Sequence, residues 1–265
     1  MKSNFMKIAA IATSVLLLTF NATYAQDIIS NLISHWPFTN VSNSTPDVYG
    51  GNDLALVNLT STNLVPGKRG NCLRFNGLDQ CLELTHSSDS ETTGLPIFST
   101  NGYTVSFWVN GPPGQYNKTI FAEGKTGQTG PLFNLATKKY QPFLDVFLRD
   151  DTGRILIKNI PSVSNVLDNS WHYIAWCDLN GACALYVDGQ LDSAKFNYTF
   201  DASITLDYTS VGALYRDPQA NFFQGSIEEL AIWSRVLSQS EVRSVMTNGI
   251  PLTLQGAHLR GHEKR

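Results

Sequence analysis

The sequence has few charged residues and no long apolar stretch after its first segment. Of its 265 residues, 15% are charged and 42% are hydrophobic, and the formal net charge is -3. A charge this mild argues against a nucleic-acid or acidic-membrane partner, and this hydrophobic content excludes a disordered chain. Beyond residue 20 no run reaches the roughly 18 apolar residues that a membrane-spanning helix requires, so no membrane span is expected.

The sequence also lacks the residue patterns of the common enzyme classes. It contains no nucleophile elbow, no phosphate-binding loop and no zinc-ligand spacing. Glycoside hydrolysis needs two carboxylates on one face, whereas Glu228 and Glu229 are adjacent and would point to opposite faces of a strand. We therefore expect a protein that is not an enzyme.

The first 25 residues have the three-part pattern of a secretory signal peptide. Two lysines precede an apolar run over residues 8–20, which is too short to span a membrane. Thr23 and Ala25 stand at positions -3 and -1 before the expected cleavage site. We expect residues 1–25 to be removed, residues 26–250 to form one domain and residues 251–265 to be a polar tail.

Cysteines and glycosylation sequons agree with a secreted, extracellular protein. The four cysteines form an even set, as expected in an oxidising compartment. The part of the chain after the signal peptide also has five Asn-x-Ser/Thr sequons, which are acceptors for N-linked glycans in a eukaryotic secretory pathway. The predicted glycosylation sites are Asn40, Asn43, Asn58, Asn117 and Asn197.

Two predicted hairpins suggest how the cysteines pair. In residues 70–84, alternating apolar residues flank a turn signal at residues 76–77, which places Cys72 and Cys81 on one face if the leucines face the core. In residues 171–189, Cys177 and Cys183 stand on either side of a short turn. We predict the disulfides Cys72–Cys81 and Cys177–Cys183 over the two crossed pairings, as four cysteines allow three connectivities.

Short strands separated by turn signals predict an all-β fold. Residues 103–109 alternate between the two faces of a strand, and similar strands recur about every 8–12 residues, which is typical of a sandwich or a barrel. One helix is expected near the C-terminus, because Ser238 and Glu241 form a capping box and Gly249 and Pro251 stop the helix.

A set of short motifs in a fixed order carries a family resemblance. The motifs occupy residues 35–38, 67–77, 104–109, 171–172, 185–189, 225–230 and 235–241. Together they resemble the laminin-G-like jelly-roll domain of the concanavalin A-like lectin/glucanase superfamily, which includes pentraxins. The resemblance covers roughly residues 31–250 and implies a two-sheet antiparallel jelly-roll sandwich. Ile174 stands where the pentraxin signature has cysteine, so the chain does not resemble a true pentraxin.

The resemblance also implies a calcium site. In this superfamily a structural Ca²⁺ often bridges an acidic residue after the first strand, loop oxygens and an acidic residue of the last strand. Glu228 matches the last-strand position, but Thr39 stands where the first position is acidic. Loop oxygens could come from Asp47, Asn52 and Asp53, so we expect Ca²⁺ at these three residues together with Glu228. The alternative is a solvated acidic loop without a bound cation.

The family further implies extracellular recognition of glycans or proteins. Our first hypothesis is a lectin-like domain that binds carbohydrate or a glycoconjugate at a loop-lined site. The alternatives are an extracellular-matrix or adhesion protein with a protein partner, and a degenerate polysaccharide hydrolase or lyase. The glucanase motif Glu-x-Asp-x-Glu is absent, and the tryptophans are expected in the core. Exposed aromatic residues at the site are expected among Tyr116, Tyr140, Tyr198, Tyr208 and Tyr215.

Overall fold

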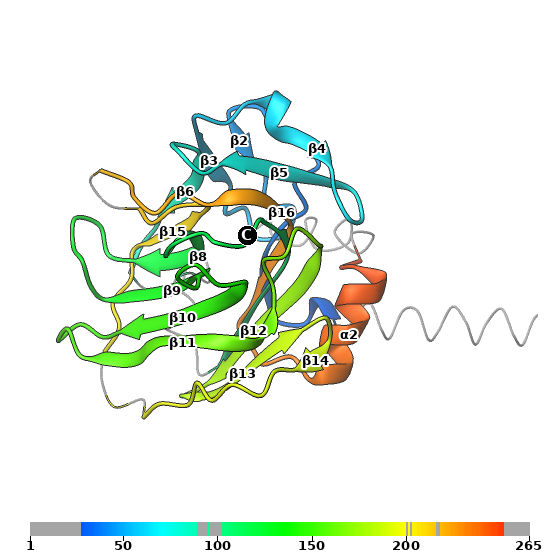
Figure 1. The fold of residues 1–265 in the computed structure, drawn as a ribbon. Helices are drawn as coiled ribbons and strands as arrows, with labels where there is room; N and C mark the ends of the chain where they lie inside the picture. Colours follow the sequence, from blue (N-terminus) through cyan, green and yellow to red (C-terminus); the bar gives the residue numbers. More distant parts are fainter. Residues whose placement is uncertain are drawn as a thin grey trace, which may run out of the picture.

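The protein is a sandwich of two antiparallel β-sheets with one helix against it (Figure 1). The computed structural model describes residues 28–88, 95, 102–199, 201, 203–215 and 218–251. The predicted signal peptide and the tail from residue 252 lie outside the described residues. No helix within the described ranges has the length and apolar character needed to cross a membrane. The predicted two-sheet sandwich is confirmed.

Each sheet contains eight strands, and their order places distant segments side by side. Sheet A runs β14 (Gln190–Leu191), β13 (Ala182–Val187), β12 (His172–Leu179), β7 (Tyr103–Asn110), β16 (Gln224–Trp233), β5 (Asn71–Asn76) and β4 (Leu64–Pro66), with β1 (Leu32–Trp36) paired to β16. Sheet B runs β11 (Ile155–Asn165), β10 (Phe143–Arg149), β9 (Leu132–Thr137), β8 (Thr119–Gly124), β15 (Tyr208–Val211), β6 (Cys81–Thr85), β3 (Leu54–Val57) and β2 (Ser44–Thr45). A short 3-10 helix, η1 (Ser61–Asn63), precedes β4.

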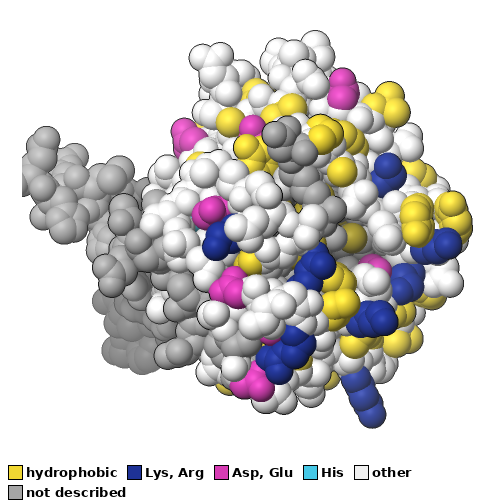
Figure 2. All heavy atoms as spheres, turned by 90° about the vertical axis from the view of Figure 1, so that its left-hand side faces the viewer, with side chains coloured by type: hydrophobic (Ala, Val, Ile, Leu, Met, Phe, Trp, Pro, Cys, Tyr) yellow, Lys and Arg dark blue, Asp and Glu magenta, His cyan; other side chains and the backbone are white. Residues whose placement is uncertain are grey.

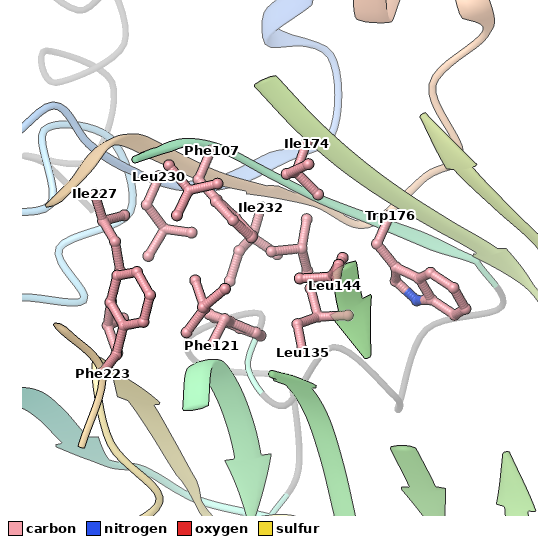
Figure 3. Close-up of a cluster of buried hydrophobic side chains, with 14 of the residues drawn as sticks. Phe107, Phe121, Leu135, Leu144, Ile174, Trp176, Phe223, Ile227, Leu230 and Ile232 are labelled. Atoms are coloured by element: carbon pink, nitrogen blue, oxygen red, sulfur yellow. The ribbon is translucent and has the colours of Figure 1, made fainter. Parts of the chain in front are cut away.

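The core lies between the two sheets because apolar residues alternate along nearly every long strand. Phe107, Ile174 and Trp176 come from sheet A, and Phe121 and Leu135 meet them from sheet B (Figure 3). All five are fully buried. Four of the five tryptophans are buried, as predicted, at positions 36, 108, 176 and 233.

The outer face of sheet A is covered by helix α2 (Gln239–Asn248). Val242 and Val245 of the helix pack on Trp108 and Trp233 of the sheet in a second buried cluster. The helix begins where predicted, with Ser238 as the N-cap and Glu241 completing a capping box. The outer face of sheet B has no comparable layer among the described residues, and it carries only a small cluster around Ala122.

The predicted disulfide between Cys72 and Cys81 does not form, and both cysteines are free. The hairpin expected at residues 70–84 is wrong, because β5 belongs to sheet A and β6 to sheet B. Leu73 and Leu82 enter the shared core, so the neighbouring cysteines point away from it on opposite sides of the sandwich. Packed sheets lie about 10 Å apart, whereas disulfide-bonded Cα atoms lie within about 7 Å.

The predicted disulfide between Cys177 and Cys183 is also absent, and both of these cysteines are free. Strands β12 and β13 do pair as a hairpin, as predicted, but Cys183 lies directly opposite Asp178. Cys177 is one residue away from that pair and therefore points to the other face of the sheet. It contacts Thr104 Oγ1 at 3.5 Å, while Cys183 packs against the core.

Candidate functional site

A pocket of about 210 Å³ lies on the outer face of sheet B, and we call it the outer-face pocket. Its floor is built by three directly opposed pairs of strands β9 and β10. These pairs are Leu132 with Arg149, Asn134 with Phe147, and Ala136 with Asp145. The residues between them, such as Phe133 and Val146, enter the core. Strand alternation therefore fixes which side chains face the pocket.

Three asparagines from other segments form the wall of the outer-face pocket. Asn117 precedes β8, Asn159 lies in β11 and Asn221 lies between β15 and β16. Their backbone φ angles are 49°, 50° and 58°, all in the left-handed region. Asparagine tolerates this region better than most residues do, so local backbone geometry explains the residue type at each position.

The side-chain amides of this pocket make no hydrogen bond to the part of the chain that the structure describes. Asn134 is 9% exposed, and its Oδ1 has no hydrogen-bond partner among the described residues. Arg149 Nε also lacks a partner within the described chain. Buried polar atoms are normally paired, because an unmade hydrogen bond costs about 1–3 kcal/mol. Two residues that line the outer-face pocket thus hold one unsatisfied acceptor and one unsatisfied donor among the described residues.

Charged groups of both signs lie in or beside the pocket. Lys138 Nζ lies 3.4 Å from Asp145 Oδ1 and donates to the carbonyl oxygen of Asn159 at 2.7 Å. Burial raises the pKa of Asp145, and the neighbouring Lys138 ammonium opposes this rise. Arg149 donates to the carbonyl oxygen of Thr129, and its guanidinium lies 5.4 Å from the Phe147 ring centroid. Phe147 offers an apolar face among these polar groups.

Two exposed tyrosines lie near the pocket residue Asn117, since Tyr116 precedes it in the chain and Tyr140 stacks on Tyr116. Tyr116 and Tyr140 are stacked with their ring centroids 5.5 Å apart, and they are 46% and 67% exposed. Figure 2 shows hydrophobic side chains interleaved with Lys and Arg on the right of the face in view, and most of the acidic groups of that face toward the left. Of the five tyrosines expected at a site, Tyr208 is instead buried.

A larger hollow of about 630 Å³ lies at the opposite sheet and includes Arg74, Asn110 and Gln224. Two of its side-chain amides bond to the protein. Asn63 Nδ2 donates to the carbonyl oxygen of Arg74 at 3.0 Å, and Asn110 Nδ2 donates to that of Asn169 at 3.2 Å. These groups hold the loops together, so the outer-face pocket is the better candidate for ligand binding.

Asp47 and Asp53, two of the residues expected to bind Ca²⁺, accept hydrogen bonds from backbone N–H groups, whereas Asn52 Nδ2 donates to Ser34 Oγ at 2.7 Å. Asp47 Oδ1 accepts from the N–H groups of His35 and Tyr49, and its Oδ2 accepts from that of Asn52. Asp53 Oδ1 accepts from the N–H of Asp47 at 2.9 Å. Asp47 therefore organises its own loop. Each N–H donor occupies a lone pair of the carboxylate that a cation would otherwise use.

The Glu228 carboxylate likewise accepts hydrogen bonds from backbone N–H groups. It is fully buried in β16, at an irregularity beside Glu229, whose φ angle is 54°. Its carboxylate accepts from the backbone N–H groups of Lys68, Arg69 and Gly70. Within the described part of the chain, no three His, Cys, Asp or Glu side chains are grouped so that they could hold a metal ion. No role for Ca²⁺ enters the function proposed below.

Adjacent carboxylates and the histidines have structural partners. Glu229 Oε2 lies 2.7 Å from His35 Nε2, so Glu228 and Glu229 do diverge as the sequence predicts. His172 lies between two carboxylates, 2.8 Å from Asp188 and 3.1 Å from Asp168. The hydrogen bond to Asp188 raises the pKa of His172, and Asp168 adds to this effect.

The sequence drew attention to Tyr116, Tyr140 and the Asn117 sequon, but not to the floor of the pocket. Asn134, Asp145 and Arg149 are the residues that it missed. Their alternation with core residues is visible in the sequence, but the same alternation occurs in every other strand. Four of the five sequon asparagines are exposed and Asn117 is half-buried.

Comparison with known proteins places the chain in a family. Residues 85–243 match the family described as the concanavalin A-like lectin/glucanases superfamily, which is more than half of the chain. The chain belongs to this superfamily, and its fold is of the carbohydrate-binding type. The resemblance deduced from the motifs is confirmed.

Relatives and solved structures agree with this assignment. The chain is 32% identical over 104 residues to the Sushi, von Willebrand factor type A, EGF and pentraxin domain-containing protein 1 of Rattus norvegicus, which is 36% of this chain and 3% of that protein. The chain is also similar to a solved structure of domain 4 of AbnA, a GH43 extracellular arabinanase from Geobacillus stearothermophilus, in complex with arabinotriose. The TM-score is 0.56 and the sequence identity is 20%. The match covers 81% of this chain and 98% of that one.

A further similarity is to the sialidase of Trypanosoma rangeli, with a TM-score of 0.60 and 13% identity, over 82% of this chain and 33% of the sialidase chain. At these identities the two solved structures show the fold alone. The chain spans a small fraction of the rat protein and about a third of the sialidase.

Proposed function

We propose that this protein is a secreted, non-enzymatic carbohydrate-binding domain and that the outer-face pocket holds its ligand. The observation that carries the proposal is that an unpaired amide oxygen and an unpaired guanidinium nitrogen lie on either side of Phe147 in one pocket. Sugar hydroxyls both donate and accept, so one ring could donate to Asn134 Oδ1 and accept from Arg149 Nε. Its apolar face would pack on Phe147.

The size and the chemistry of the pocket support binding without catalysis. Sites that enclose a drug-sized ligand are roughly 300–1,000 Å³, so a pocket of about 210 Å³ fits one sugar unit of a longer chain. Asp145 is the single carboxylate among the ten residues that line it. Glycoside hydrolysis generally uses two. Tyr116 and Tyr140 would extend the contact to a neighbouring sugar unit.

The test is binding of linear oligosaccharides, arabinotriose among them, by the wild-type protein and by Asn134→Leu, with every protein produced in bacteria and therefore without glycans. Leucine has a similar size but removes both the donor and the acceptor. Loss of two neutral hydrogen bonds, about 1–3 kcal/mol in total, corresponds to roughly 5- to 150-fold weaker binding in calorimetry.

A matched control is Asn43→Leu, which makes the same change at an exposed residue just before β2, at the far edge of sheet B. This control should bind as the wild type does. The proposal is overturned if the wild type binds no oligosaccharide of the set, or if both variants bind equally well. Turnover of any oligosaccharide would overturn the non-enzymatic assignment.

A further inference from the structure

We propose that Asn117 is an N-glycosylation site and that its glycan lies over the outer-face pocket and closes it to the ligand. The inference rests on the function proposed above, because it assigns a control to the same site. In the reaction, Asn117 Nδ2 bonds to the anomeric carbon of an oligosaccharide carried on a lipid diphosphate. The amide loses one proton and the lipid diphosphate leaves.

Asn117 differs from the other four sequon asparagines in its position. It lines the outer-face pocket, and the other four do not. Its side chain makes no hydrogen bond to any described residue, so the Nδ2 atom is free to carry a sugar. In contrast, Asn58 Nδ2 donates to the carbonyl oxygen of Asp79 at 3.1 Å.

The surroundings of Asn117 direct an attached glycan along the pocket. Tyr116, the preceding residue, is stacked against Tyr140 on one side. Asn134 and Asp145 form the floor on the other side. A sugar on Asn117 therefore starts between the tyrosine pair and the floor. Because the pocket is only about 210 Å³, a bulky attached glycan leaves little room for a ligand.

Thr119 of the same sequon shows when the modification takes place. Thr119 is fully buried, and its Oγ1 has no hydrogen-bond partner in the described part of the protein. A glycosyltransferase cannot reach this hydroxyl in the folded domain. The sequon is thus available before β8 folds, and the state of the pocket is set during synthesis.

The unpaired hydroxyl also provides a clean variant. Thr119→Val removes the sequon but keeps the Asn117 side chain, and valine loses no hydrogen bond at this position. Thr119→Ser keeps the sequon and is the matched control. The three proteins are secreted from a glycosylating eukaryotic cell line, and wild type is also produced in bacteria without glycans.

Three measurements test the inference. Mass spectrometry after enzymatic deglycosylation should find Asn117 occupied in wild type and Thr119→Ser and vacant in Thr119→Val. Hydroxyl-radical oxidation of the half-buried Phe147 should be several-fold slower in the occupied proteins. Oligosaccharide binding by Thr119→Val and by the bacterial protein should be at least about tenfold tighter than by the occupied proteins.

An unmodified Asn117 in the secreted wild type would overturn the inference, and so would equal oxidation of Phe147 in wild type and Thr119→Val. If oxidation differs as expected but no protein binds any oligosaccharide, the glycan does cover the pocket and the proposed ligand class is wrong. Equal binding by occupied and vacant proteins would show that the glycan leaves the ligand site open, which also overturns the inference.

Discussion

Replacing Glu228 by glutamine should destabilise the domain whether or not calcium is present. The Glu228 carboxylate is fully buried and accepts from three consecutive backbone N–H groups, at 2.8 Å from Arg69 and 2.6 Å from Gly70, with Lys68 on its other oxygen. The loop lies very close, since a Cβ added to Gly67 would stand 2.3 Å from Glu228 Oε2. Glu228 therefore fixes the 67–70 loop onto β16.

The size of the effect follows from the donors that a glutamine side chain would leave unpaired. Its one oxygen can still accept from Arg69 and Gly70, but its NH2 group would face the N–H of Lys68. A hydrogen bond to a charged group contributes about 1.5–3 kcal/mol, and the two that remain become weaker neutral bonds. Relief of the buried charge offsets part of this loss. We expect a net destabilisation of about 2–4 kcal/mol.

Urea unfolding of the wild type and Glu228→Gln, each with excess CaCl2 and with EDTA, measures this difference. For a domain of this size 2–4 kcal/mol corresponds to a Tm about 4–16 °C lower. The control Glu83→Gln alters a carboxylate that accepts from the Gln219 side-chain amide at 3.2 Å, and it should change stability by at most about 0.5 kcal/mol. If EDTA destabilises the wild type and abolishes the difference from Glu228→Gln, then Glu228 is a cation ligand and the reasoning fails.

Two further predictions concern titratable groups. Asp188 and Asp168 raise the pKa of His172 in the folded protein above its usual value of about 6.5. The ion pairs of His172 therefore stabilise the fold fully below pH ~6.5. This stabilisation is lost as the pH rises through the pKa of the folded state. His172→Gln should therefore lower the free energy of unfolding, measured in urea, more at pH 5.5 than at pH 9, since both values lie about one unit or more from the usual pKa. A loss of stability that is the same at both pH values would contradict this prediction. Ellman's reagent should titrate four thiols in denaturant but react slowly with the native protein, because burial raises the pKa of Cys81 to about 12 and of Cys177 to about 11. Recovery of a disulfide-linked Cys72–Cys81 or Cys177–Cys183 peptide would refute the prediction that all four cysteines are free thiols.

Local patterns identified the strands but not always their partners. Residues 171–189 form the hairpin that alternation and a short turn predict, since β12 and β13 are adjacent in sheet A. Residues 70–84 show the same signals, yet β5 pairs with β16 and β6 with β15, both far along the chain. The side chain of Asn76 accepts from the N–H groups of Leu78 and Asp79, which builds a loop that carries the chain across to the other sheet. Pairing with distant strands decides between these outcomes.

The predicted calcium ligands show a similar limit. Glu228, Asp47 and Asp53 are acidic residues near turns, and the sequence alone does not say what their oxygens bind. In the structure they accept from backbone N–H groups that lie up to 160 residues away in the chain. Such donors belong to the backbone of every residue type, so they leave no mark in the sequence. Carboxylates that fix loops and carboxylates that bind cations therefore look alike until the fold is known.

Helix α2 covers one sheet and not the other, which is the reason why we propose the ligand site on sheet B. Trp108 and Trp233 on the outer face of sheet A are buried beneath Val242 and Val245 of helix α2, so these large aromatic residues act in folding and not in recognition. Strands β9 and β10 of sheet B have no such cover among the described residues, and their outward side chains include unpaired polar atoms. The core of a two-sheet sandwich uses the inner face of each sheet, and helix α2 covers the outer face of sheet A. Among the described residues, the outer face of sheet B is the sheet face that no helix covers, and it is where we propose that the ligand binds.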